Sequence, residues 1–164
     1  MSMIGNFVSL QEEQLQALIE DPGSVEAFLH PEDSDDDEPA NHLDVDKAWQ
    51  GIHFLLTGEA WGGTPPLSMA VLGGTEFGGD VGYGPAHYLT SAQVLEVAQA
   101  LMKVSRSELT TRFSPVAMSE AAIYPEIWDE GEEALNYLLG YYDSLVLFYQ
   151  EAASRGDAVL QYIS

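Results

Sequence analysis

Short segments rich in β-forming residues lie near both ends of the chain, at residues 4–8 and 158–163. Between them the pattern is mainly helical, with one further strand-like segment at residues 87–89. Strands so far apart in the sequence gain partners most simply by meeting in one sheet, against which the helices pack. The sequence therefore predicts a single α/β domain over residues 1–164. We expect a small mixed sheet that includes both termini, several packed helices, and more helix than strand.

The segment at residues 43–58, LDVDKAWQGIHFLLTG, has the pattern of an amphipathic helix with both ends marked. Asp44 is suited to accept hydrogen bonds from the first-turn amides, and Gly58 is suited to the left-handed conformation that ends a helix. Apolar residues recur at steps of three and four and predict one buried stripe. A second, polar stripe runs beside it and consists of Asp46, Gln50, His53 and Thr57.

Three further helix starts carry the capping-box pattern, in which a hydroxyl side chain is followed three residues later by Glu or Gln. The longest predicted helix covers residues 131–155, and Gly156 is suited to end it. Residues 73–85 contain many glycines and predict a long loop. The capping pairs are Ser9 with Glu12, Thr90 with Gln93, and Ser105 with Glu108.

The chain is strongly acidic, with 27 Asp and Glu against 5 Lys and Arg and a formal net charge of -22. Residues 32–38 hold six carboxylates in seven positions, which predicts an acidic mobile loop at about residues 31–42. Such a surface repels phosphate backbones and anionic lipid, so we expect no binding to nucleic acid or membrane. It attracts a basic protein or a cation, although an acidic or salty habitat would also favour it for solubility alone. The predicted partner-docking patch consists of Asp33, Asp35, Asp36, Asp37 and Glu38.

Several kinds of chemistry lack the residues that they need. The absence of Cys excludes disulfides, thiolate nucleophiles and Cys-ligated metals. No two of the four histidines have the three- or four-residue spacing of helical metal ligands, so we expect no metal and no cofactor. The chain has no Gly-x-Ser-x-Gly motif, and the glycines at 78–84 lack the Lys-Ser/Thr ending of a phosphate loop. With no membrane-length apolar run and no signal-peptide pattern, the expected location is the cytoplasm.

His53 is the leading candidate for a functional side chain. Its ordinary pKa of about 6.5 suits acid–base chemistry, and the helix pattern places Asp46 and Gln50 on the same face. Trp49 and Trp61 would wall a pocket there, with residues 73–85 as its lid. The same pattern is also typical of a partly buried histidine with a satisfied hydrogen bond beside core aromatics. The candidate binding residues are Asp46, Trp49, Gln50, His53, Trp61, Tyr83 and His87, and none is assigned a catalytic role.

Residues 43–58 and three other segments resemble the YfbM-like family of bacterial proteins, domain of unknown function 1877, in order and spacing. The resemblance covers essentially the whole chain. It implies a single α/β domain of about this length and brings no established activity, cofactor or catalytic residue. An Arg commonly stands in the family at the position of His87, so an anion site that depended on this Arg would be lost here. The other segments are PLSMAVLGG at 66–74, VGYGPAHYLT at 81–90 and IYPEIW at 123–128.

Two functions fit these observations. The first is a non-enzymatic acidic domain that covers a basic surface of a partner, as an immunity protein or antitoxin would cover a toxin that acts on nucleic acid. The alternative is a small-molecule-binding or hydrolytic enzyme with a pocket around Trp49, His53 and Trp61. A His53 packed only against aliphatic neighbours, with no cavity beside it, would remove the enzyme hypothesis.

Overall fold

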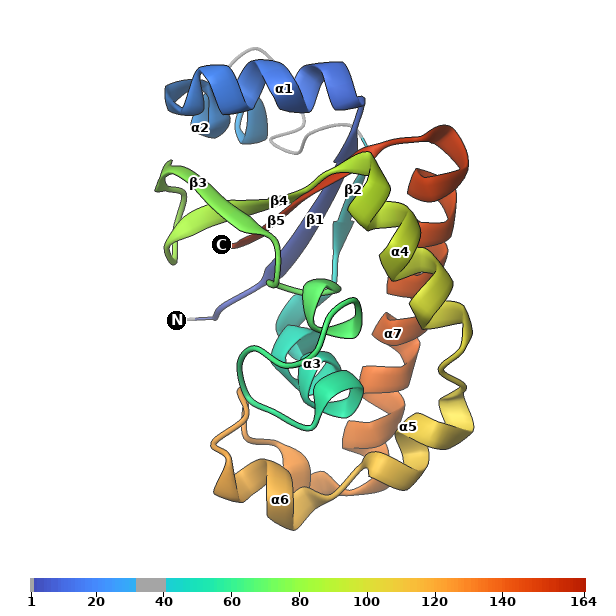
Figure 1. Ribbon diagram of the computed structural model, residues 1–164. Helices are drawn as coiled ribbons and strands as arrows, with labels where there is room; N and C mark the ends of the chain where they lie inside the picture. The colour runs from blue at the N-terminus through green and yellow to red at the C-terminus, as the bar shows by residue number, and fades with distance from the viewer. Residues whose placement is uncertain (1, 32–40) are drawn as a thin grey trace.

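An antiparallel sheet of five strands lies at the centre of the computed structural model, which describes residues 2–31 and 41–164 (Figure 1). The order across the sheet is β2-β1-β5-β4-β3. β1 and β5 pair from Gly5 opposite Ile163 to Leu10 opposite Ala158, which confirms that the two ends of the chain meet in one sheet. Every described strand pair is antiparallel, so the sheet is not mixed in strand direction. The strands are β1 (Gly5–Leu10), β2 (His42–Asp44), β3 (Thr75–Asp80), β4 (Pro85–Leu89) and β5 (Ala158–Ile163).

Helices cover both faces of this sheet, and in the described part of the chain they contain more residues than the strands, as predicted. Within residues 2–31 and 41–164, no helix is both long enough and apolar enough to cross a bilayer. The α-helices are α1 (Glu12–Glu20), α2 (Val25–Leu29), α3 (Trp49–Thr57), α4 (Ser91–Met102), α5 (Arg106–Arg112), α6 (Pro115–Glu120) and α7 (Glu132–Arg155). Single turns of 3-10 helix are η1 (Pro22–Ser24), η2 (Asp46–Ala48), η3 (Leu67–Met69) and η4 (Trp128–Glu130).

The two faces of the sheet belong to two separate hydrophobic clusters. Successive side chains of a strand point to opposite faces, so Phe7 and Val159 join one cluster while Val8 and Leu160 join the other. Figure 1 places α1 and α2 on one side of the sheet and α3, α4 and α7 on the other. Both faces are therefore covered, and β1 and β5 are buried along their whole length.

The capping patterns predicted two helix starts correctly and a third incorrectly. The side chain of Thr90 accepts a hydrogen bond from the backbone N–H of Gln93, and Ser105 does the same for Glu108. At α1, however, Ser9 lies inside β1, because that strand continues to Leu10. Gln14 takes over the reciprocal role, since its Oε1 accepts from the backbone N–H of Gln11 at 3.0 Å.

The helix predicted for residues 43–58 is shorter in the structure. His42–Asp44 form strand β2, which pairs with β1, and α3 begins only at Trp49. Asp44 caps no helix; its Oδ1 accepts from the backbone N–H of Asp46 at 2.6 Å. Gly58 ends α3 in the left-handed region at φ 79°, as predicted. The apolar residues before Trp49 fit the spacing of a helix and also the spacing of a strand. Only the pairing with β1 decides that a strand forms there.

The prediction of a long glycine-rich loop at residues 73–85 is wrong. This segment contains β3, which pairs with β4 through Thr75 opposite Tyr88 and Phe77 opposite Ala86. Asp80 closes the connecting turn by accepting hydrogen bonds from the backbone N–H groups of Gly82 and Gly84. These bonds lower the pKa of the Asp80 carboxyl. A hairpin paired to the sheet therefore stands where the sequence indicated a free lid.

Candidate functional site

A cavity of about 80 Å³ lies beside α3, where that helix faces the two segments that follow it in the chain. Four of the seven predicted binding residues line this cavity, and most of its surface is apolar. Because ligand pockets commonly measure about 300–1,000 Å³, this cavity suits a single small group. The lining residues are Trp49, Gln50, His53, Ala60, Trp61, Gly62, Ser68, Val71, Leu72 and Gly73.

Trp49 is the fixed aromatic wall of the cavity. Its indole N–H donates to the backbone carbonyl of Met3 at 2.9 Å, and its ring is 5.9 Å from that of Trp61 and 5.9 Å from that of Tyr124. A Cβ at Gly5 would lie 2.7 Å from the Cβ of Trp49, so the small residue lets β1 approach α3 closely. Trp61, by contrast, is 65% exposed. One wall of the cavity is therefore anchored in the core and the other faces solvent.

Gln50 is a structural link and not a free binding group. Its Oε1 accepts from the backbone N–H of Tyr124 at 2.8 Å, and its Nε2 donates to the carbonyl of Ala60 at 3.3 Å. Both ends of the buried amide are thus satisfied, as buried polar groups generally are. Gln50 fixes the position of α3 between the segments that carry Ala60 and Tyr124.

His53 differs from Gln50 because one of its polar atoms is unsatisfied. The residue is 6% exposed, and its Nε2 is buried with no hydrogen-bond partner among the described residues. Burial lowers the pKa of the imidazole below 6.5, and the backbone of Gly62 and the carboxylate of Glu59 oppose this shift only in part. The ring is therefore neutral at pH 7. It offers a hydrogen-bonding nitrogen rather than a proton.

The far wall of the cavity, which includes Ser68 and Gly73, is held by a buried polar network. Gln161 in β5 donates to the carbonyl of Met69 at 2.6 Å, and its Oε1 accepts from the backbone N–H of Gly74 at 3.1 Å. Gln161 also donates to the hydroxyl of Tyr149, which in turn donates to the carbonyl of Ala70 at 2.6 Å. Burial raises the pKa of Tyr149, so the hydroxyl stays protonated. The sheet and α7 thus position this wall.

Three predicted binding residues do not line this cavity. Asp46 lies in η2, before α3 begins, and its Oδ2 accepts from the hydroxyl of Tyr137 at 2.6 Å. Burial and this bond raise the pKa of Tyr137. Tyr83 lies in the turn between β3 and β4 and is 42% exposed. His87 lies in β4, with its Nε2 3.7 Å from the carboxylate of Glu76 and its Nδ1 buried without a hydrogen-bond partner in the described part of the chain.

The cavity lacks an assembled catalytic pair. Ser68 and His53 both line it, but no hydrogen bond joins them among the bonds of the described residues. The part of the chain that the structure describes also contains no group of three His, Asp or Glu side chains suited to a metal ion. The predicted acidic patch at Asp33, Asp35, Asp36, Asp37 and Glu38 lies outside the described residues.

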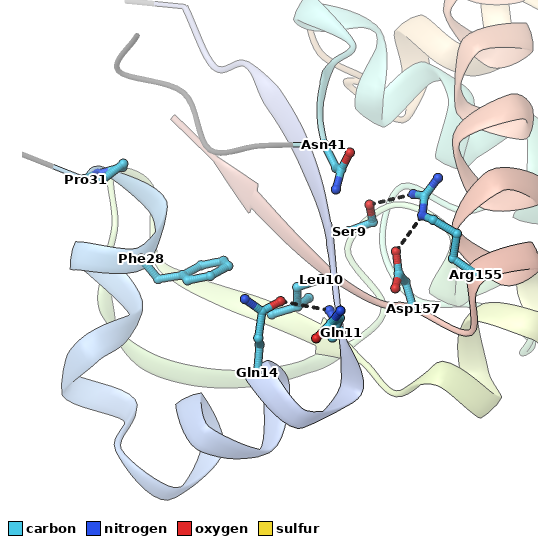
Figure 2. Close-up of a pocket in the computed structure, with 9 residues that line it drawn as sticks. All are labelled: Ser9, Leu10, Gln11, Gln14, Phe28, Pro31, Asn41, Arg155 and Asp157. Carbon is cyan, nitrogen blue, oxygen red and sulfur yellow. Dashed lines mark hydrogen bonds and ion pairs between the residues drawn. The ribbon is translucent and has the colours of Figure 1, made fainter. Parts of the chain in front are cut away.

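A second cavity, of about 450 Å³, was not foreseen from the sequence and lies where β1, α2 and the end of α7 come together (Figure 2). Figure 2 shows the guanidinium of Arg155 between two partners: its Nε donates to Asp157 at 2.8 Å and its Nη2 to the hydroxyl of Ser9 at 3.0 Å. This cavity is larger than the one beside His53, and more of its surface is polar. Its lining residues are Ser9, Leu10, Gln11, Gln14, Phe28, Pro31, Asn41, Arg155 and Asp157.

Comparisons with known proteins agree with this architecture. A family model described as a domain of unknown function (DUF1877) matches residues 1–162. Protein YfbM of Escherichia coli (strain K12) is 32% identical over 171 residues, which cover 99% of this chain and 99% of that protein. The crystal structure of YfbM, described as a protein of unknown function, matches with a TM-score of 0.75 at 24% identity, over 98% of this chain and 99% of that one. This structural likeness shows the fold.

Proposed function

The chain belongs to the family described as domain of unknown function DUF1877, and from that premise we propose that it is a non-enzymatic domain that covers a basic surface of another protein. The observation that carries the proposal is the charge: 27 acidic residues face only 5 basic ones. The chain cannot neutralise this excess from its own side chains. A basic partner supplies the missing charge, and electrostatic steering speeds the encounter.

The contacts of the three arginines strengthen this argument, because each arginine is paired with a carboxylate of the same chain. Arg106 pairs with Asp143, and Arg155 pairs with Asp157. Arg112 lies 3.8 Å from the carboxylate of Glu108 and donates to the backbone carbonyl of Leu55. A cation that is already paired with one carboxylate of the chain neutralises few of the remaining carboxylates. The surface therefore stays strongly negative.

The class of partner that fits is a protein whose own substrate is anionic, such as a toxin that acts on nucleic acid. Such a protein has a basic substrate site, and an acidic domain placed over it blocks the site and neutralises its charge. An immunity protein or an antitoxin would act in this way. No catalytic group is needed for this role.

Capture with variants of matched size tests the proposal. The wild-type domain is immobilised beside a variant in which Asp35, Asp36 and Asp37 are all replaced by Asn, and lysate is passed over both at 50 mM and 300 mM salt. We expect a basic partner to bind the wild-type domain at low salt and to associate more slowly with the variant, with little change in dissociation rate. Recovery of no basic partner at either salt concentration would refute the proposal.

The cavity beside His53 favours a second candidate, the binding of a small molecule between Trp49 and Trp61. Its volume of about 80 Å³ is small for a complete substrate. A hydrolytic reaction would in addition need a nucleophile activated by a base, and Ser68 is not hydrogen-bonded to His53. A fragment that binds the cavity with high affinity, together with recovery of no basic partner, would support this second candidate over the first.

A further inference from the structure

His53 lines the small cavity and has a buried nitrogen without a hydrogen-bond partner among the described residues. The residue is 6% exposed, and its Nε2 makes no hydrogen bond within the described part of the chain. An unpaired buried polar atom destabilises the protein, and a ligand removes this cost by completing the bond. Neutral imidazole accepts at the nitrogen that carries no proton, so a ligand that only donates selects the form in which Nε2 accepts. A donor group can therefore complete this site.

The aromatic walls favour a planar cation as the donor. The rings of Trp49 and Trp61 lie 5.9 Å apart at an angle of 44°, and both line the cavity. A guanidinium stacks on aromatic faces and is attracted by the ring quadrupole within about 6 Å, most strongly by Trp. It is also more weakly hydrated than an ammonium group, which lowers the cost of entering an apolar cavity.

The size of the cavity and the charges near it also favour a guanidinium. The volume of about 80 Å³ is below the usual range for a whole ligand and suits the head of one side chain. No Lys or Arg is among the lining residues. The carboxylate of Glu59 lies close enough to act on the charge of His53, so it also favours a cation there. An arginine is in addition one of the residues that most often anchor protein interfaces.

We propose that this cavity receives the guanidinium head of an arginine carried by the basic partner, an inference that rests on the proposed function. The stem of that arginine lies across Trp61, which is 65% exposed, while the head enters beside Trp49 and donates to His53. Because Nε2 is shielded from solvent, the ring of Trp61 turns outward to admit the head. The general acidity of the domain then attracts the partner, and the cavity selects arginine over lysine.

Small probes test the chemistry without any partner protein. Ethylguanidinium chloride and ethylammonium chloride are titrated separately into the domain at pH 7.5 and equal ionic strength, and the ¹⁵N resonances of the His53 ring and the tryptophan fluorescence are followed. We expect ethylguanidinium to shift the His53 resonances and to bind about tenfold more tightly than ethylammonium, because it stacks on the indole rings and is more weakly hydrated. Equal affinities, or ethylguanidinium binding that leaves the His53 resonances unmoved, would overturn the proposal.

Variants separate the cavity from the general acidity of the surface. Trp61→Ala, which alters an exposed side chain and should fold normally, is expected to weaken ethylguanidinium binding about tenfold. His53→Phe removes the acceptor and should weaken it to a similar degree. Glu20→Gln removes one exposed carboxylate on α1, on the opposite side of the sheet, and should leave the affinity unchanged. An equal loss of affinity in Glu20→Gln would show attraction by net charge alone and overturn the proposal.

Two peptides identify the source of the guanidinium. A lysine-rich peptide with one central arginine is compared with the same peptide carrying citrulline, the neutral isostere, at that position. We expect only the arginine peptide to shift the His53 resonances, with about tenfold tighter binding. Binding of ethylguanidinium without binding of the arginine peptide would overturn the assignment to a partner protein. Failure of the proposed function is a distinct result, in which both probes bind as expected but the capture experiment yields no basic protein.

Discussion

The cavity around Arg155 and the cavity beside His53 differ in which of their polar groups lack a hydrogen bond. The cavity around Arg155 has a volume of about 450 Å³, but its polar side chains bond to one another: Arg155 donates to Asp157 and Ser9. The cavity beside His53 has about 80 Å³ and an apolar wall, yet His53, which lines it, has a buried nitrogen with no hydrogen-bond partner among the described residues. The volume of a cavity is therefore a poor guide to whether the cavity binds a ligand. A buried polar atom that lacks a hydrogen bond is a stronger indication of a ligand than volume.

The two cavities also differ in how firmly the fold holds them. The wall beside His53 is fixed by Gln161 and Tyr149, both of them fully buried. The wall around Arg155 consists largely of side chains near the surface, and the Arg155 side chain is itself 44% exposed. We expect changes to the first network to cost far more stability than changes to the second.

Replacing Gln161 with Leu gives the largest expected effect and tests this difference directly. The change leaves the carbonyl of Met69 and the N–H of Gly74 buried without their partner, at about 1–3 kcal/mol for each unpaired group. We expect the free energy of unfolding to fall by about 3 kcal/mol in urea denaturation at pH 7. The matched control is Gln14→Leu in the other cavity, which we expect to cost less than about 1 kcal/mol. Similar losses in both variants would contradict the contrast.

Replacing Arg155 with Ala should have an intermediate effect. Asp157 is left without its ion pair, but the partial exposure of Arg155 lets solvent screen the interaction. We expect a loss of about 1 kcal/mol in unfolding free energy, part of which disappears in 1 M salt. The control is Arg106→Ala, which removes the more exposed pair with Asp143 and should cost about half as much or less. A loss as large as that of Gln161→Leu would mean that this cavity is also held by a buried network.

The smallest expected effect is the loss of folding stability that comes from protonation of His53 at acidic pH. Burial lowers the pKa of His53 in the folded protein, so below about pH 6.5 the unfolded chain binds more protons at this residue than the folded one. The contribution of His53 is therefore fully present above pH 6.5 and is lost as the pH falls towards the folded pKa. Comparing the wild type with His53→Gln between pH 7.5 and 5 isolates this term from the repulsion among carboxylates. A wild type that gains stability relative to the variant at acidic pH would contradict it.

The sequence predicted local elements better than it predicted pairing. The long helix α7 and the caps at Thr90 and Ser105 follow from periodicity and local hydrogen bonding, and both were found. The strands β2 and β3 were missed, since one is three residues long and the other contains glycines that suggest a loop. Pairing with a neighbouring strand, which no local pattern contains, decides their conformation.

The same distinction between local patterns and distant contacts applies to the residues around the cavity beside His53. Trp49, Gln50 and His53 were placed together correctly because they share one helix. Gln161 was missed because it contacts Met69, 92 residues earlier, and a glutamine in a strand gives no sign of such a partner. Residues that follow one another on an element can be grouped from sequence, whereas residues that only the folded chain brings together cannot.

The position of β5 in the sheet has a consequence for how the protein is made. β5 comes last of the described strands in the chain, yet it lies third of five in the sheet, between β1 and β4. As the ribosome synthesises the chain, β1 with β2 and the hairpin of β3 with β4 emerge before the strand that pairs with both β1 and β4. Such distant pairing is slow and leaves strand edges open to aggregation until it is complete. Translation that slows before residue 158 should therefore favour aggregation of the unfinished sheet.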